Sequence, residues 1–137
     1  MNKISVGHVV LENKPLNNFE ILDAVRDLGI KNFRGCFMRD TLPKRPKRKE
    51  CGILNTDSST GTGHHWIAWY KNGKSKYYFD SYGLPPPLEL IEYLKSPILY
   101  NTLQVQKGGH HCGHTCLYIL NELNKGRDFQ DVINDLF

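Results

Sequence analysis

Long apolar runs are missing from this sequence of 137 residues, and so are internal repeats and low-complexity linkers. No run approaches the roughly 18 apolar residues that a membrane-spanning helix needs, so we expect no such helix. The N-terminal stretch MNKISVGHVVLENK has no sustained apolar segment, so we expect no secretory signal peptide. We therefore expect one domain over residues 1–137, a monomer that acts inside a cell or in a particle assembled there.

Cysteine is scarce as well, with four residues in the chain. Without a secretion signal, cysteines are more often free thiols or ligands than a disulfide framework. The apolar fraction of 39% and the charged fraction of 23% are typical of a globular protein rather than a disordered chain. The length is sufficient for a hydrophobic core that needs no disulfide.

Positive charge is modest overall, with a formal net charge of +4, but it is concentrated in the segment KRPKRK, residues 44–49. The basic residues of this segment are Lys44, Arg45, Lys47, Arg48 and Lys49. Pro46 makes a regular helix unfavourable there. A solvated loop is the simplest interpretation, and contact with nucleic-acid phosphates or a nuclear-import signal are the functional alternatives.

Periodicity and turn residues predict an α+β fold. The expected helices are 17–29, 85–96, 112–126 and a short one within 128–137. The expected strands are 51–55, 65–70, 76–80 and 98–106. In the first helix, Asn17 or Asn18 can cap the N-terminus and Gly29 the C-terminus. The apolar residues on one of its faces are Phe19, Leu22 and Val25.

Asn72-Gly73, between two aromatic-rich strands, is the strongest short signal for a β-hairpin. If these are the central residues of a type I′ turn, the numbers of opposed residues sum to 145 and His65 faces Asp80. Opposed side chains lie about 4.5–5.5 Å apart at Cβ on one face, whereas His64 points to the other. The imidazole and carboxylate can then hydrogen-bond, which orients the ring and favours its protonated form. Such pairs are also common as structural contacts, so the pair alone does not establish catalysis.

Cys112 stands at the start of a predicted helix, where backbone N–H groups and the helix dipole lower the pKa of a thiol. Gly108, Gly109 and Gly113 let the backbone approach a substrate carbonyl. Cys116, one helical turn further along, falls on the apolar stripe and is expected in the core.

A nucleophile, a base and an orienting group can thus be assembled from Cys112, His65 and Asp80. The N–H of Cys112 and the amide of a nearby glutamine, Gln106 or Gln104, can hold a developing oxyanion.

A metal site is the competing interpretation, because HHCGHTC at 110–116 holds five of the residue types that bind zinc, and Cys36 or Cys51 can add more. The spacing is not that of a paired knuckle, so we expect no metal site. We expect three histidines at the rim of the site, facing solvent, where each can tune the pKa of the Cys112 thiol. They are His110, His111 and His114.

Three motifs in fixed order resemble those of the adenovirus protease (adenain) family, and more closely its relatives in Maverick/Polinton transposons and related viruses. They are ECGILNTDSSTGTGHHWIAWY (50–70), YYFDSYG (77–83) and QVQKGGHHCGHTC (104–116). The order His-Trp, Asp, then Gln before Cys-Gly also resembles SUMO-specific proteases. The similarity covers most of the chain, including 19–43.

The resemblance implies a papain-like cysteine protease core with permuted chain order, a mostly antiparallel sheet flanked by helices. By position, the histidine is the base, the aspartate orients it, the glutamine supplies an oxyanion-hole amide and the cysteine is the nucleophile. These catalytic residues are His65, Asp80, Gln106 and Cys112. Trp66 and Gly113 are expected to contact the substrate beside them.

The sequence also departs from adenain. Asp80 stands where adenain has glutamate, and the interval from Gln106 to Cys112 is one residue shorter, so Gln104 stays a second candidate. The segment SPILYNTLQVQ (96–106) has no cysteine for the disulfide through which adenain binds its activating peptide. DNA stimulation stays open through the basic segment 44–49.

The resemblance therefore implies a thiol endopeptidase without a cofactor, which cleaves precursors of viral or transposon structural proteins after small residues such as glycine. The host nucleus or the virion would be its location. A protease that removes a ubiquitin-like modifier is the alternative enzyme. A zinc- or nucleic-acid-binding module is the alternative outside the enzymes.

Overall fold

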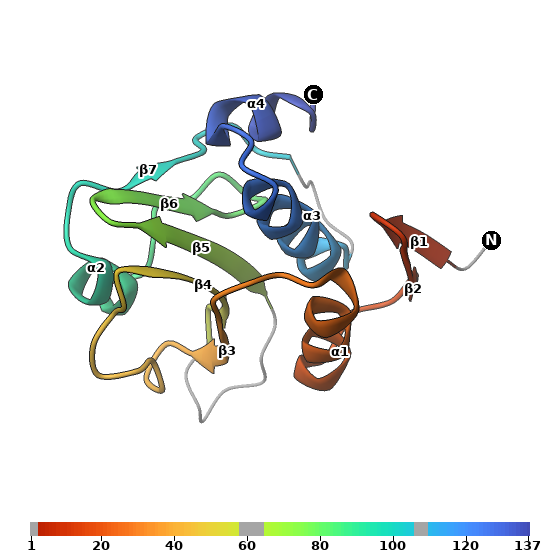
Figure 1. Ribbon diagram of the computed structural model, residues 1–137, viewed down its shortest axis with the longest axis horizontal. Helices are drawn as coiled ribbons and strands as arrows, with labels where there is room; N and C mark the ends of the chain where they lie inside the picture. Colours follow the sequence, from red (N-terminus) through yellow and green to blue (C-terminus); the bar gives the residue numbers. More distant parts are fainter. Residues whose placement is uncertain (1–2, 58–64, 106–109) are drawn as a thin grey trace.

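The computed structural model describes residues 3–57, 65–105 and 110–137 (Figure 1). Its strands are β1 (Lys3–Val6), β2 (Val9–Glu12), β3 (Phe33–Met38), β4 (Lys49–Asn55), β5 (Trp66–Asn72), β6 (Ser75–Phe79) and β7 (Leu99–Tyr100). Its helices are α1 (Asn18–Leu28), α2 (Leu88–Leu94), α3 (Cys112–Asn124) and α4 (Phe129–Asn134). Within these ranges, no helix is both long and apolar enough to cross a membrane.

Strands β3 to β7 form one sheet in the order β3-β4-β5-β6-β7, and β1 pairs with β2 in a separate small sheet. The three central strands are antiparallel, while β3 and β7 run parallel to their neighbours at the two edges. Figure 1 shows α1 and α3 on one side of the large sheet and α2 on the other. The expected α+β architecture, with helices flanking a mostly antiparallel sheet, is confirmed.

Strand β5 packs against helices on both of its faces. Ile67 and Trp69 belong to the apolar cluster that includes α2, whereas Trp66 and Ala68 belong to the cluster that includes α1 and α3. Because successive side chains of a strand point to opposite faces, the part of β5 that is covered on both sides, residues 66–69, is apolar at every position. Trp66 thus faces the helix that begins at Cys112.

Helix α1 has the expected caps but buries a different face. The side chain of Asn17 accepts a hydrogen bond from the N–H of Glu20, whose carboxylate accepts one from the N–H of Asn17, and Gly29 ends the helix with a φ of 72°. Phe19 and Leu22 are 71% and 40% exposed, so they do not face the core. The buried residues are Ile21, Ala24 and Val25.

The β5–β6 hairpin is present, but the register expected from its turn is wrong. Asn72 pairs with Ser75, and the numbers of paired residues sum to 147 along the hairpin. Asn72 stays in β5 because it also pairs with the first residue of β4, and the N–H of Gly73 donates to the carbonyl of Arg48 (2.7 Å). The turn therefore centres on Gly73 and Lys74, with Gly73 at a φ of 62°. A change of two in the sum keeps each side chain on its face and changes only its partner.

Strands β1, β2 and β3 were not expected from the sequence, and the strand expected over 98–106 is reduced to the two residues of β7. Helices α2, α3 and α4 lie within the expected segments. The predicted stripe of α3 is confirmed as core, since Cys116 and Leu120 are fully buried.

Candidate active site

His65 and Asp80 meet at one end of the sheet, just before β5 and just after β6. Nε2–H of His65 donates to Oδ1 of Asp80 at 2.6 Å, and the two side chains are 12% and 3% exposed. The ladder of the hairpin ends at the pair of Ala68 with Phe79, so His65 and Asp80 lie just beyond its paired residues. Their contact therefore forms without the direct pairing that the expected register implied.

The backbone of Asp80 is held by the side chain of Asn101, which the sequence did not reveal as part of the site. Nδ2 of Asn101 donates to the carbonyl of Asp80 (2.6 Å), and its Oδ1 accepts from the N–H of Asp80 (3.1 Å). Asn101 is 5% exposed. An amide that bonds both the N–H and the carbonyl of one residue replaces the hydrogen bonds of a neighbouring strand. Asn101 therefore fixes the backbone from which the Asp80 carboxylate extends.

Cys112 is the first residue of α3 and lies beside the start of β5. The N–H of Trp66 donates to its sulfur at 3.4 Å. The thiol also hydrogen-bonds the His65 ring, and because Asp80 occupies Nε2, Nδ1 is the nitrogen that faces the sulfur. The structure thus brings together the thiol, the imidazole and the carboxylate that the sequence places far apart.

Only Cys112 among the four thiols has its pKa lowered. Burial raises that pKa, but hydrogen bonds from His65 and the N–H of Trp66, together with the charge of His65, outweigh it. For the other thiols burial raises the pKa, to about 12 for Cys36 and Cys51 and well above the ordinary value for Cys116.

The imidazole of His65 shows the complementary shift. Burial lowers its pKa, but the hydrogen bonds to Asp80 and Cys112 raise it further, to about 9. A lowered thiol pKa beside a raised imidazole pKa favours a thiolate–imidazolium pair near neutral pH. A thiolate is the form of cysteine that attacks carbonyl carbon.

Two of the groups predicted for the oxyanion hole, the N–H of Cys112 and the side chain of Gln104, belong to described residues. The first N–H groups of a helix have no partner within it, so the N–H of Cys112 is one of the donors at the α3 N-terminus. Gln106 lies outside the described residues, together with Gly108 and Gly109. Gln104 is described and exposed. The choice between the two glutamines stays a prediction.

Gly113 and Trp66 form a tight contact beside the site. A Cβ at Gly113 would lie 3.2 Å from Cδ1 of Trp66 and 3.3 Å from Cδ1 of Leu16, so glycine lets α3 approach β5 closely. Nε1–H of Trp66 donates to the carbonyl of Leu16 (2.8 Å). The structure gives Gly113 a packing role, and its contact with substrate stays a prediction.

Trp66 also lines a cavity of about 500 Å³ between β3 and the segment that precedes α1. Apolar and amide side chains share its wall: Leu16, Asn17, Phe37, Met38, Asn55 and Trp66. Trp66 thus contacts both this cavity and the sulfur of Cys112.

The histidines around Cys112 contact the N-terminal segment. Nε2–H of His110 and of His111 both donate to Oδ1 of Asn13, at 2.8 and 2.7 Å, and Nε2–H of His114 donates to the carbonyl of Glu12 at 2.7 Å. His114 is 3% exposed, so its expected place at a solvent-facing rim is wrong, and burial lowers its pKa.

The metal-site alternative concerns residues that the structure describes. Over 3–57, 65–105 and 110–137, no group of three or more histidine, cysteine, aspartate or glutamate side chains is placed to hold a metal ion. Cys51 instead donates to the carbonyl of Lys31 (3.6 Å) inside the core.

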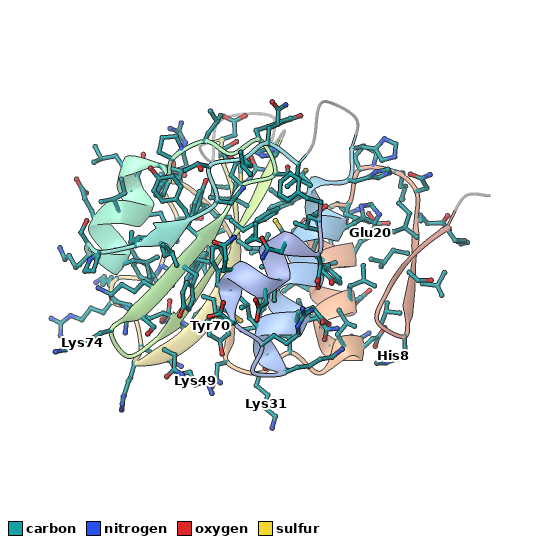
Figure 2. The ribbon with its side chains drawn as sticks, turned by 90° about the horizontal axis from the view of Figure 1, so that it is seen from above. His8, Glu20, Lys31, Lys49, Tyr70 and Lys74 are labelled. Atoms are coloured by element: carbon teal, nitrogen blue, oxygen red, sulfur yellow. The ribbon has the colours of Figure 1, made fainter. Side chains whose placement is uncertain are left out.

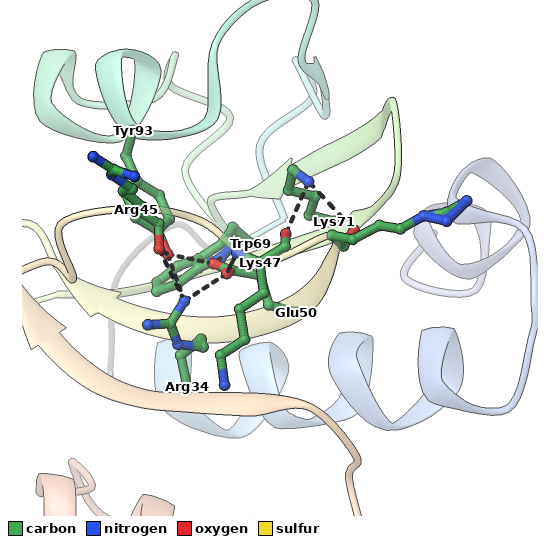
Figure 3. Close-up of polar contacts among 8 residues, drawn as sticks. Arg34, Arg45, Lys47, Glu50, Trp69, Lys71 and Tyr93 are labelled. Atoms are coloured by element: carbon green, nitrogen blue, oxygen red, sulfur yellow. Dashed lines mark hydrogen bonds and ion pairs between the residues drawn. The ribbon is translucent and has the colours of Figure 1, made fainter.

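The basic segment 44–49 is fixed to the sheet by a buried carboxylate (Figure 3). Glu50 is 1% exposed and accepts from Nη1 of Arg34 (2.8 Å), the hydroxyl of Tyr93 (2.6 Å) and Nε1 of Trp69 (3.0 Å). It also accepts from the backbone N–H of Lys47. These contacts fix the backbone that enters β4.

Carbonyl groups of the segment accept further hydrogen bonds. The carbonyl of Arg45 accepts from the guanidinium of Arg34, and the carbonyls of Lys47 and Arg48 accept from Nζ of Lys71. Within the described ranges, no ion pair forms at Lys44, Arg45, Lys47, Arg48 or Lys49. Figure 2 shows Lys49 and Lys74 extending away from the ribbon. The backbone of segment 44–49 is thus fixed, while its lysine and arginine side chains are exposed to solvent.

The chain is similar in sequence to viral proteases. The "Protease" of Bovine adenovirus 2 is 36% identical over 75 residues, 47% of this chain and 33% of that protein. The "SUMO-1 cysteine protease S273R" of African swine fever virus (isolate Tick/South Africa/Pretoriuskop Pr4/1996) is 36% identical over 63 residues, 43% of this chain and 23% of that protein. The chain thus spans a third or less of these relatives, and no family model matches it.

Among solved structures, the ASFV pS273R protease aligns with a TM-score of 0.65 and 21% identity, over 89% of this chain and 62% of that one. At that identity the likeness concerns the fold. The similarity to Maverick/Polinton proteins stays a prediction. The expected resemblance to the adenain-like and SUMO-specific cysteine proteases is confirmed by these viral relatives in sequence and by pS273R in fold.

Proposed function

We propose that this protein is a cysteine endopeptidase with Cys112 as nucleophile, His65 as base and Asp80 as the group that orients the base. One observation carries the proposal. Cys112 alone among the four thiols has a lowered pKa, and it contacts an imidazole whose other nitrogen is bound to a buried carboxylate. That arrangement activates a thiol for attack on an acyl group.

In the proposed reaction, the Cys112 thiolate adds to the carbonyl carbon of a peptide bond. The oxyanion is held by the N–H of Cys112 and the amide of Gln106. The imidazolium of His65 gives its proton to the leaving amine as the C–N bond breaks, which leaves a thioester. Neutral His65 then takes a proton from water, whose oxygen attacks the thioester, and the acid product leaves as the thiolate–imidazolium pair is restored.

The cavity beside Trp66 suits an extended polypeptide that approaches the sulfur from the β3 side. We propose precursors of viral or transposon structural proteins as substrates, cleaved after small residues such as glycine by a monomeric enzyme in the host nucleus or the virion. The relatives are viral proteins named as proteases, which supports a protein substrate. Removal of a ubiquitin-like modifier is the alternative, because one relative is named a SUMO-1 protease.

Hydrolysis of a panel of glycine-containing peptides and of modifier conjugates tests this function. We expect wild-type protein to cut the peptides, Cys112→Ala to be inactive and Cys51→Ala, whose thiol lies outside the cavity, to keep its activity. Cleavage of conjugates alone would favour the modifier protease. If Cys112→Ala were as active as wild type, or if neither substrate were cut, the peptidase proposal would be wrong.

We further propose that the basic segment 44–49 binds DNA. Its backbone is fixed at the start of β4, and β5 runs from this end of the sheet to the thiol over seven residues, roughly 20 Å. A duplex bound at the start of β4 would therefore lie at the far end of β5 from the thiol. Each lysine or arginine that neutralises a phosphate releases counterions, so binding weakens as salt rises.

Fluorescence anisotropy of a labelled duplex at several salt concentrations tests this contact. Replacing Arg48 and Lys49 by alanine is expected to weaken binding and reduce the slope of log affinity against log salt by about two. Lys125→Ala is the matched control, since Lys125 is paired with Glu122 on α3 (2.9 Å). Equal affinities for all three proteins would support a merely solvated loop.

A further inference from the structure

We propose that Tyr82 is a positioning residue that holds the imidazole of His65 between Asp80 and Cys112 and favours its cationic form. The inference deepens the proposed peptidase function and depends on it. The two rings are stacked, with centroids 4.5 Å apart and planes 27° from parallel. Tyr82 lies in the turn that follows β6, two residues after the aspartate that binds the ring.

Tyr82 is fixed by the same carboxylate that binds the imidazole. Its N–H donates to Oδ1 of Asp80 (2.9 Å), and the N–H of the next residue, Gly83, donates to the carbonyl of Asp80 (2.8 Å). Gly83 has a φ of 71°, and a Cβ there would lie 2.8 Å from the carbonyl oxygen of Thr102. These contacts fix the backbone of the turn that carries the Tyr82 ring over His65.

The stacking constrains a motion that the hydrogen bonds leave free. Asp80 and Cys112 contact the two ring nitrogens, and these contacts lie near the plane of the ring. They resist sliding within that plane more than tilting out of it. The Cys112 contact also changes once the sulfur carries an acyl group. Contact with the ring face does not depend on either event, so it keeps Nδ1 directed at the sulfur throughout the reaction.

The π face of Tyr82 also favours positive charge on His65. A cation over an aromatic ring within about 6 Å of its centroid is attracted by the ring quadrupole. Among the described residues, the titratable groups that face the imidazole are Asp80, Cys112 and Tyr82 itself. The first two account for a raised pKa by hydrogen bonding and charge, and the stacked ring acts in the same direction.

The titration of His65, followed by its ring C–H resonance in NMR between about pH 6 and pH 10, tests the inference. Tyr82→Leu keeps apolar cover over the imidazole but removes the π face, so we expect the midpoint to fall by about half a pH unit. Tyr82→Phe should recover most of that difference. The resonance is assigned by its loss in His65→Gln.

Tyr70→Leu is the matched control, because Tyr70 pairs with Tyr77 across the same hairpin at a centroid distance of 6.4 Å. We expect it to leave the midpoint where it is in wild type. An unchanged midpoint in Tyr82→Leu, an equal fall in Tyr70→Leu, or no recovery in Tyr82→Phe would each overturn the role of Tyr82.

Peptide hydrolysis separates this inference from the function on which it depends. With a peptide that wild type cuts, Tyr82→Leu is expected to lower kcat about threefold or more and to leave KM nearly unchanged. A change in KM alone would make Tyr82 a substrate contact and refute its positioning role. If wild type cuts no peptide, the peptidase proposal fails, while the NMR titration still decides whether Tyr82 acts on His65.

Discussion

Replacing Cys112 by alanine is expected to expose a pH dependence of folding stability that the wild-type protein conceals. The pKa of His65 rises from its ordinary 6.5 to about 9 in the folded protein. Stability from this group is fully present below about pH 6.5 and is lost as pH rises through about 9. The pKa of Cys112 is lowered, so its contribution is present above the ordinary thiol value and is lost as pH falls through the folded value.

The two contributions oppose each other in wild type. Between the two folded pKa values, the thiolate–imidazolium pair holds one proton. The unfolded chain, with a thiol and a neutral imidazole, also holds one between about pH 6.5 and the ordinary pKa of a thiol. Equal proton numbers give zero slope of unfolding free energy against pH, so this pair leaves wild-type stability almost flat over the part of that range that lies above the lowered pKa of Cys112.

Alanine at position 112 removes one side of that balance. His65 keeps its bond to Asp80, so its pKa stays above the ordinary value although the contribution of the thiol is lost. With a folded pKa as high as about 9, stability would fall by about 2 kcal/mol between about pH 6.5 and pH 8.5. We expect a loss of about 1–2 kcal/mol, because the variant lacks the thiolate.

Urea denaturation of both proteins at about pH 6.5, 7.5 and 8.5 measures the effect. Other titrating groups are common to the two chains, so the difference between the two slopes isolates the pair. We expect the variant to lose stability relative to wild type as pH rises. Parallel dependences would refute the ion pair as the resting state of the site, whatever the protein hydrolyses.

Three further outcomes test the surroundings of the pair. Asp80→Asn is expected to lower the pKa of His65 towards its ordinary value and to slow alkylation of Cys112 by iodoacetamide at neutral pH about a hundredfold, a result that an unchanged rate would contradict. Asn101→Ala should cost about 1–3 kcal/mol in urea denaturation, because it leaves two buried backbone groups of Asp80 without their partner; a loss below about 0.5 kcal/mol would show that water replaces the amide. Gly52→Ala should lower the melting temperature sharply, because the new Cβ would lie 2.3 Å from the buried indole of Trp69. An unchanged melting temperature would mean that the Trp69 indole can move aside.

Local sequence determined the features that depend on neighbours along the chain. The capping box at Asn17 and the left-handed residue Gly29 delimit α1, because each satisfies or ends hydrogen bonds within one turn. The two aromatic strands and their glycine turn specify a hairpin. Cys112 was expected at a helix start and is the first residue of α3, although the side chain of His111 does not cap that helix.

Competition between neighbouring strands decided the register of that hairpin. The turn residues alone favoured Asn72 in the turn, but pairing with β4 and the bond from Gly73 to the carbonyl of Arg48 keep Asn72 in β5. Side-chain alternation survived the change, and for that reason the expected contact of His65 with Asp80 was found through a register that was wrong. No pattern within the hairpin carries information on a third strand.

Long-range packing decided the rest. Apolar periodicity suggested Phe19 and Leu22 for a shared face of α1, yet the sheet and α3 cover the opposite side of the helix. Asn101 and Tyr82 joined the site from segments that sequence spacing does not relate to Cys112. The sequence by itself therefore set the helix ends, the hairpin and the reactive residue types. Only the tertiary structure lowered one thiol pKa and raised the pKa of its neighbouring imidazole, because burial and charge at a site depend on what chain folding brings there.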